Sequence, residues 1–125
     1  MTSLDDSLKT QEALISPTVL KHSQLDNTPF HDKQKAFYNT CFAIRKIIKE
    51  KLYRVQSTNL EQYFLKKFNV SRAQVYRLMD CASVLECLYG LYPLPHKYRI
   101  CKELKQKAGV GKECRQLWSD VLKNV

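Results

Sequence analysis

The sequence predicts an all-α fold of about five helices around a central helix-turn-helix, and three observations predict it. Apolar residues recur at helical spacing over residues 33–54 and 112–123. Residue types that cap the start of a helix stand at Thr58 and Ser71. No segment shows the strict apolar–polar alternation or the turn residues of strands and hairpins. A chain of 125 residues is long enough for one hydrophobic core.

Residues 1–32 are expected to form a flexible acidic leader to the folded domain. Polar residues dominate this stretch, two prolines interrupt it, and no period is sustained. It holds two lysines against five acids, whereas residues 33–125 hold 19 lysines and arginines against seven acids. The apolar residues at 13–15, 19 and 20 offer a way to dock on the domain or on a partner, but disorder is the interpretation we favour.

The first helix of the domain is expected over residues 33–54. Its apolar stripe follows Phe37, Cys41, Ile44, Ile48 and Leu52. The opposite face is basic and carries Lys35, Arg45, Lys46, Lys49 and Lys51. We interpret this face as a solvated surface, with tracking of a phosphate backbone as the alternative.

Two capping boxes predict the next two helices, over residues 59–67 and 71–89. Thr58 with Glu61 would open the first helix, and Ser71 with Gln74 would open the second. Between them Phe68-Asn69-Val70 forms a tight turn, because asparagine tolerates the left-handed backbone that such a turn needs. The arrangement is typical of a helix-turn-helix, whose second helix commonly lies in the DNA major groove.

The second of these helices divides into two faces. Its inward positions are Val75, Leu78, Ala82 and Leu85. Its outward positions are Arg72, Ala73, Tyr76 and Arg77, where an arginine can read guanine or hold phosphate and a tyrosine hydroxyl can contact phosphate. Farther along, apolar residues surround the axis, which predicts that the C-terminal segment covers this half. Asp80 would repel phosphate, so we place it beyond the groove.

The C-terminal part predicts two further helices after an extended connector. Two prolines keep residues 91–95 out of a helix. Helices are then expected over residues 96–108 and 112–123, separated at Gly109. We interpret Trp118 as a core anchor of the last helix, with base stacking as the weaker alternative.

Cysteine usage and composition exclude several classes of protein. The five cysteines are odd in number and form no C-x-x-C pair, and no histidine has ligand spacing to them. We therefore expect free, buried thiols in a reducing compartment, and neither a metal nor a cofactor. No apolar run approaches the ~20 residues of a membrane span. The chain also lacks a nucleophile–base pair or a phosphate-cradling loop, so we do not expect an enzyme.

Three segments together resemble the helix-turn-helix of plasmid and phage DNA-binding proteins, including the ParB-like group. They are Leu60-x-x-Tyr63-Phe64, Phe68-Asn69-Val70-Ser71-Arg72 and Val75-Tyr76-Arg77-Leu78. The continuation through Leu85-Glu86 to Leu117-Trp118 is also similar to small DNA-binding proteins of bacteria and fungi. The likeness spans residues 57–122 and departs from the family pattern at Leu65 and Asn69, where a small residue and glycine are usual.

That resemblance implies a set of DNA-facing residues, namely Ser71, Arg72, Gln74, Tyr76 and Arg77. The periodicity adds Ala73, and the basic end of the first helix adds Lys66 and Lys67 as phosphate contacts. We therefore expect a DNA-binding protein, associated with transcription or with a chromosome or plasmid, in the nucleus of a eukaryote or otherwise in the cytoplasm. The alternative is an interaction subunit of a chromatin or nucleic-acid complex that binds protein partners through its N-terminal tail or C-terminal helices.

Overall fold

A computed structural model describes residues 3–20, 30–95 and 97–123, and within these ranges every regular element is a helix. The elements are α1 (Leu4–Leu14), α2 (Pro17–Leu20), α3 (Phe30–Lys49), the 3-10 helix η1 (Leu52–Val55), α4 (Leu60–Phe68), α5 (Arg72–Cys87), α6 (Tyr98–Ala108) and α7 (Lys112–Lys123). The all-α prediction is confirmed. No helix in the described ranges is both long enough and apolar enough to cross a bilayer.

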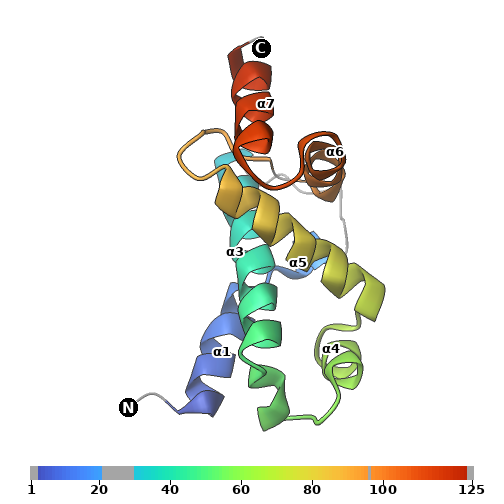
Figure 1. Ribbon diagram of the computed structural model, residues 1–125. Coiled ribbons are helices and arrows are strands. Elements are labelled where there is room, and N and C mark those ends of the chain that lie inside the picture. Colours follow the sequence, from blue (N-terminus) through green and yellow to red (C-terminus); the bar gives the residue numbers. More distant parts are fainter. Residues whose placement is uncertain (1–2, 21–29, 96, 124–125) are drawn as a thin grey trace.

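The described part of the leader is helical, where a flexible tail was expected. Ser3 caps α1 by accepting a hydrogen bond from the Asp6 N–H (3.1 Å). Leu8 and Ile15 are buried, because α1 lies along α3 and η1 (Figure 1). Leu8 and Ile15 are seven residues apart and so share a helical face, but two positions are too few to predict a helix, and their burial depends on a surface that distant residues build. The rest of the expected leader up to residue 29 lies outside the described residues.

The long helix expected over residues 33–54 is broken near its end. α3 stops at Lys49, and Lys51 adopts a left-handed backbone (φ 55°) before η1 begins. The break redirects the chain so that Leu52 is buried at 2% exposure on η1 rather than continuing the stripe of α3. No glycine or proline marks this position, so the periodic pattern continued across it.

Helix α5 is the central element of the domain. It crosses α3 on one side, while α6 and α7 cover its C-terminal half (Figure 1). Residues from every side of that half are buried, namely Cys81, Ala82, Val84, Leu85 and Leu88. The apolar residues of this half are therefore enclosed, as expected, while Asp80 and Glu86 stay exposed and the first turns of α5 present a broader exposed face.

The last two helices lie within their expected ranges, and the start expected at residue 96 falls outside the described residues. Trp118 of α7 is 9% exposed, and its indole Nε1 donates a hydrogen bond to the Pro93 carbonyl (3.0 Å). Trp118 is therefore a core anchor, which also ties α7 to the connector that precedes α6.

Candidate nucleic-acid interface

The junction of α4 and α5 begins with a cap at Asn59 rather than at Thr58. The Asn59 side chain accepts a hydrogen bond from the Gln62 N–H (3.1 Å), so α4 starts at Leu60. Asparagine is a stronger N-cap than threonine, and here the two residues compete at adjacent positions. The cap is therefore displaced by one residue from Thr58, and the expected capping box is not formed, because the Asn59 N–H donates to the Ser57 hydroxyl (3.3 Å).

The turn between the two helices has the expected conformation. Asn69 is left-handed (φ 55°, ψ 44°), and its N–H donates to the Leu65 carbonyl (3.0 Å). Ser71 then caps α5 by accepting from the Gln74 N–H (3.2 Å). Val70 and Val75, on either side of this cap, are both buried. The turn therefore sets how the chain leaves α4 and enters α5.

An aromatic cluster supports α4 from inside the molecule. The ring of Tyr63 lies edge-on to Phe64 (centroids 4.9 Å apart) and to Phe68 (6.2 Å). Tyr63 and Phe64 are buried, whereas Leu65 is 48% exposed and points away from the core. Leu65 therefore takes no space between the helices, although the resemblance implied a small residue at this position.

The first two turns of α5 expose the residues expected to face DNA. Arg72, Ala73, Tyr76 and Arg77 are exposed, while Val75 on the opposite side is buried. The Arg72 guanidinium lies 5.4 Å from the ring centroid of Tyr76. Arg77 lies 5.9 Å from the ring centroid of Tyr98 on α6. Ser71 and Lys66 are exposed as well.

Two members of the expected set are held by the N-terminal segment, which sequence reasoning did not foresee. The Gln74 side-chain amide donates to the Leu20 carbonyl, where the capping box would have turned it back to Ser71. The Lys67 Nζ lies 3.9 Å from a carboxylate oxygen of Glu12 on α1. A proline-interrupted polar stretch carries no local signal for either contact.

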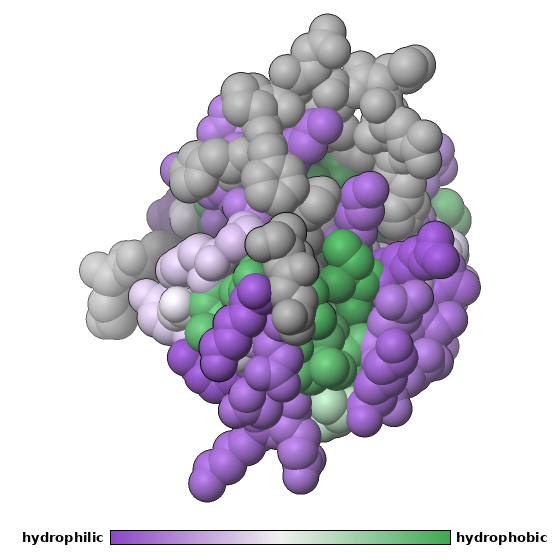
Figure 2. All heavy atoms as spheres, turned by 90° about the horizontal axis from the view of Figure 1, so that it is seen from above, coloured by the Kyte–Doolittle hydropathy of each residue, from purple (hydrophilic) through white to green (hydrophobic). Residues whose placement is uncertain are grey.

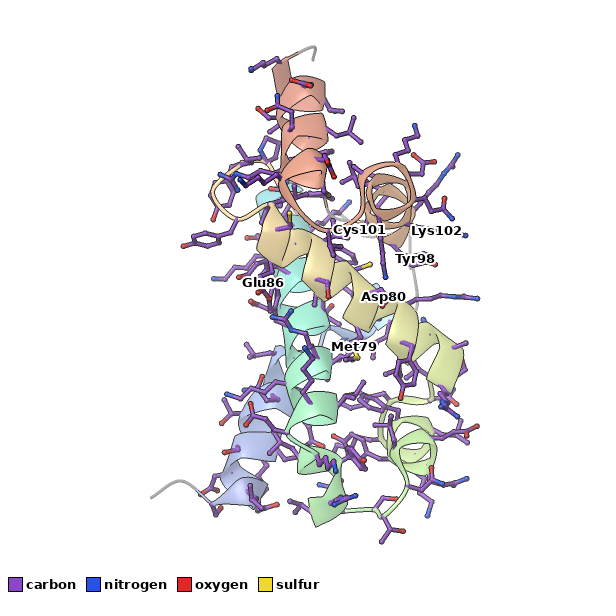
Figure 3. All side chains as sticks on the ribbon, viewed as in Figure 1. Met79, Asp80, Glu86, Tyr98, Cys101 and Lys102 are labelled. Atoms are coloured by element: carbon purple, nitrogen blue, oxygen red, sulfur yellow. The ribbon has the colours of Figure 1, made fainter. Side chains whose placement is uncertain are left out.

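Two acids of α5 are paired with basic residues of other helices, beyond the first two turns. Asp80 lies 3.5 Å from Lys105 of α6, and Glu86 lies 2.5 Å from Arg45 of α3. Figure 3 shows the two carboxylate-bearing residues at separate positions along α5. Pairing with a cation lowers the repulsion that either acid would exert on an approaching phosphate.

The five cysteines are free thiols, as expected, and three of them meet where α3, α5 and α6 pack together. Hydrogen bonds from Cys101 and Cys41 lower the pKa of Cys81 to about 5. Burial and the neighbouring thiols raise the pKa of Cys41, and the hydrogen bond to Cys81 raises that of Cys101. No group of histidines, cysteines and acids in the described ranges could hold a metal ion.

A cavity of about 220 Å³ between α5 and α6 is lined by two of these thiols, Cys81 and Cys101. Its lining includes Asp80, Cys81, Tyr98, Cys101 and Lys102, several of which are labelled in Figure 3. Cys81 and Cys101 are each only 1% exposed.

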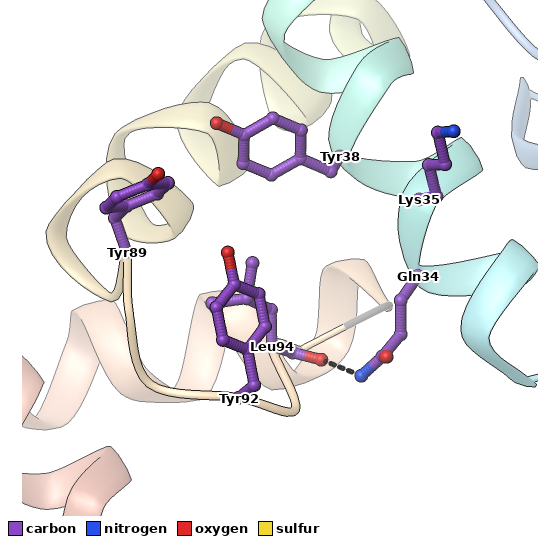
Figure 4. A pocket seen from close by; sticks show the side chains of 6 residues that line it. All are labelled: Gln34, Lys35, Tyr38, Tyr89, Tyr92 and Leu94. Carbon is purple, nitrogen blue, oxygen red and sulfur yellow. Dashed lines mark hydrogen bonds between the residues drawn. The ribbon is translucent and has the colours of Figure 1, made fainter.

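A second cavity, of about 240 Å³, was not predicted from the sequence. It opens near the C-terminal end of α5 and is lined by Gln34, Lys35, Tyr38, Tyr89, Tyr92 and Leu94 (Figure 4). The three tyrosines come from α3 and from the connector after α5. The only sequence signal for this cavity is the pair of tyrosines at 89 and 92 around Gly90. Such a pattern is also typical of an ordinary connector.

Seen from above, the molecule shows a central hydrophobic area with hydrophilic side chains on both sides (Figure 2).

Comparisons with protein-family models, with curated proteins and with solved structures find no match for this chain.

Proposed function

We propose that this protein binds double-stranded DNA, with α4, the turn at Asn69 and α5 acting as a helix-turn-helix. The observation that carries the proposal is the face formed by the first two turns of α5. It presents two arginines and a tyrosine to solvent, next to the basic last turn of α4. A net charge of +9 favours a polyanionic partner.

Within this proposal the two arginines specify sequence. They stand on the part of the second helix that enters the major groove in helix-turn-helix complexes. A guanidinium there makes a bidentate contact with guanine, worth about 1–3 kcal/mol of discrimination. Arg72 and Arg77 now lie over tyrosine rings. Moving an arginine away from an exposed aromatic ring costs about 0.5–1 kcal/mol. A good contact between the arginine and a base contributes more than this.

The lysines that end α4 act differently, because the first helix of such a unit crosses the DNA backbone. Lys66 and Lys67 reach phosphate, which carries no sequence information. Lys67 must exchange its 3.9 Å contact with Glu12 for a phosphate. Gln74 is assigned to positioning, because its amide is engaged with Leu20.

The test compares arginine and lysine variants on a selected duplex and on random duplex DNA over a series of salt concentrations. Arg72→Ala and Arg77→Ala should reduce preference for the selected site by about 5- to 150-fold, while non-specific binding changes little. Lys66→Ala should weaken binding to both duplexes alike and reduce the salt slope by about one. Lys112→Ala, on the first turn of α7, which packs near the C-terminal end of α5 and away from its first two turns, is the matched control and should change neither.

Parallel losses for the arginine and Lys66 variants on both duplexes would contradict groove reading by α5. If no variant loses affinity, the basic face is a solvated surface. The alternative, a protein-docking subunit built on the same helices, would then account for the fold, and its binding would depend weakly on salt.

A further inference from the structure

The cavity lined by three tyrosines has features of a binding site rather than of a packing gap. Tyr89 is 63% exposed and Tyr92 is 65% exposed, so two large aromatic rings face solvent beside the same opening. In Figure 4 they surround the space together with Tyr38 of α3. Exposed aromatic side chains that gather around one cavity indicate a ligand with an apolar or planar part.

The connector that carries these rings is held in place at three carbonyls. Gln34 of α3 donates to the Leu94 carbonyl (2.7 Å), and Trp118 of α7 donates to the Pro93 carbonyl (3.0 Å). Arg115 of α7 donates to the Tyr89 carbonyl (2.7 Å). Two helices therefore fix the backbone from which Tyr89 and Tyr92 project. A site whose backbone is already ordered loses little conformational entropy when a ligand binds.

The third ring is also supported. The centroid of the Tyr38 ring lies 4.4 Å from that of the Phe42 ring. The Arg45 guanidinium lies 4.5 Å from the centroid of the Phe42 ring. Arg45 in turn is paired with Glu86 (2.5 Å). This layered arrangement holds Tyr38 as one wall of the cavity.

Charge narrows the chemistry of the ligand. Lys35 lines the cavity, and none of the six lining residues is acidic. Glu86, an acid of the neighbouring turn of α5, is paired with Arg45. An aromatic cage for a methylated ammonium group would hold a cation, which Lys35 opposes. An anionic ligand with a planar ring satisfies both the tyrosines and the lysine.

Size narrows it further. At about 240 Å³ the cavity is smaller than the roughly 300–1,000 Å³ of sites that enclose a drug-sized ligand. A cavity of this size suits one planar ring of a ligand, with the rest of the ligand outside the cavity. Proteins that bind single strands combine cationic residues along the backbone with aromatic rings on which bases stack.

We propose that the tyrosine cavity binds an unpaired nucleobase of single-stranded nucleic acid, stacked against Tyr89 and Tyr92, with its phosphate held by Lys35. This site is independent of the proposed duplex interface. The first residue of α5 lies about 24 Å along the helix axis from the end that carries the cavity, given 16 residues in α5.

The experiment measures fluorescence anisotropy of a labelled oligothymidylate against the full chain. Tyr92→Ala should weaken binding by about 5- to 150-fold, the range that one stacked base supplies. Tyr92→Phe keeps the ring and should bind as the parent does. Lys35→Ala should reduce the slope of log affinity against log salt by about 0.7. Lys49→Ala, on the last turn of the same helix, is the matched control and should keep the parent's affinity and slope.

Because Tyr92 is 65% exposed, its variants should keep the fold, which circular dichroism checks; Tyr89→Ala provides a second variant. The proposal is overturned if the alanine variants bind the oligonucleotide as the parent does, or if Tyr92→Phe loses as much affinity as Tyr92→Ala. A proline-rich peptide that binds in its place, and whose binding Tyr92→Ala abolishes, would also overturn it.

Duplex titrations with the same proteins separate this proposal from the proposed function. Tyr92→Ala should leave duplex binding intact, and Arg72→Ala should leave oligothymidylate binding intact. Failure of duplex binding alone would overturn the helix-turn-helix function, and failure of oligothymidylate binding alone would overturn the tyrosine site.

Discussion

Glu12 is a nearly buried acid whose partners come from another helix. Its side chain is 11% exposed, accepts a hydrogen bond from the Tyr63 hydroxyl (2.5 Å) and faces Lys67. Burying a carboxylate is costly unless hydrogen bonds and opposite charge compensate for the lost water. This single residue therefore links α1 to α4.

Tyr63→Phe should lower the free energy of unfolding by about 1.5–3 kcal/mol, because it removes a hydrogen bond to a charged group and keeps the ring. Urea denaturation near neutral pH measures the change. Tyr76→Phe, on an exposed position of α5, is the control and should stay within about 0.5 kcal/mol of the parent. A Tyr63→Phe protein as stable as the parent would show that the bond to Glu12 contributes nothing.

The same hydroxyl predicts a pH dependence. Burial, and then the hydrogen bond to Glu12, raise the pKa of Tyr63 above its ordinary value of 10. Above about pH 10 the unfolded chain releases this proton while the folded chain keeps it, so stability is lost as the pH rises. The parent should lose more stability than Tyr63→Phe between about pH 9 and about pH 11. Equal losses would contradict the raised pKa.

At the scale of an element, the turn between α4 and α5 depends on one backbone conformation. Asn69 is left-handed, which costs most L-residues roughly 1–2 kcal/mol. Asparagine and glycine adopt it at lower cost. The position explains why the chain can reverse between the two helices within a few residues.

Asn69→Ala should therefore destabilise the protein by about 1–2 kcal/mol, whereas Asn69→Gly should change stability much less. Thermal unfolding followed by far-UV circular dichroism measures both variants. The opposite order, with glycine the more damaging, would show that the asparagine side chain rather than the backbone matters.

At the scale of the whole molecule, Trp118 connects the last helix to the rest of the domain. It is buried among the core residues, and its indole holds the connector at Pro93. The same connector presents Tyr89 and Tyr92. Trp118 thus contributes both to core packing and to the order of the backbone that carries the tyrosine cavity.

Trp118→Ala should cost about 3–5 kcal/mol, from lost burial and the cavity left behind. Chemical denaturation measures the loss, and the exposed Val121→Ala on the same helix is the control. A Trp118→Ala variant that unfolds with the parent's midpoint would show that α7 packs without this anchor.

Local signals in the sequence predicted much of the fold. Caps, periodic stripes and breakers act within a few residues, so the cap at Ser71, the left-handed turn at Asn69 and the stripes of α5 and α7 follow from neighbouring residues. The exposed face of α5 followed from the same periodicity. Its assignment to DNA stays a prediction.

Only the tertiary structure decided which distant residues meet. The packing of α1 on α3, the break at Lys51 and the engagement of Gln74 by Leu20 depend on surfaces built by residues far apart in the chain. The tyrosine cavity joins residues 34–38 to residues 89–94 in the same way. By itself the sequence determined helices, caps and faces, because these depend on local backbone energetics. Pairing between helices depends on burial, which is a property of the assembled core.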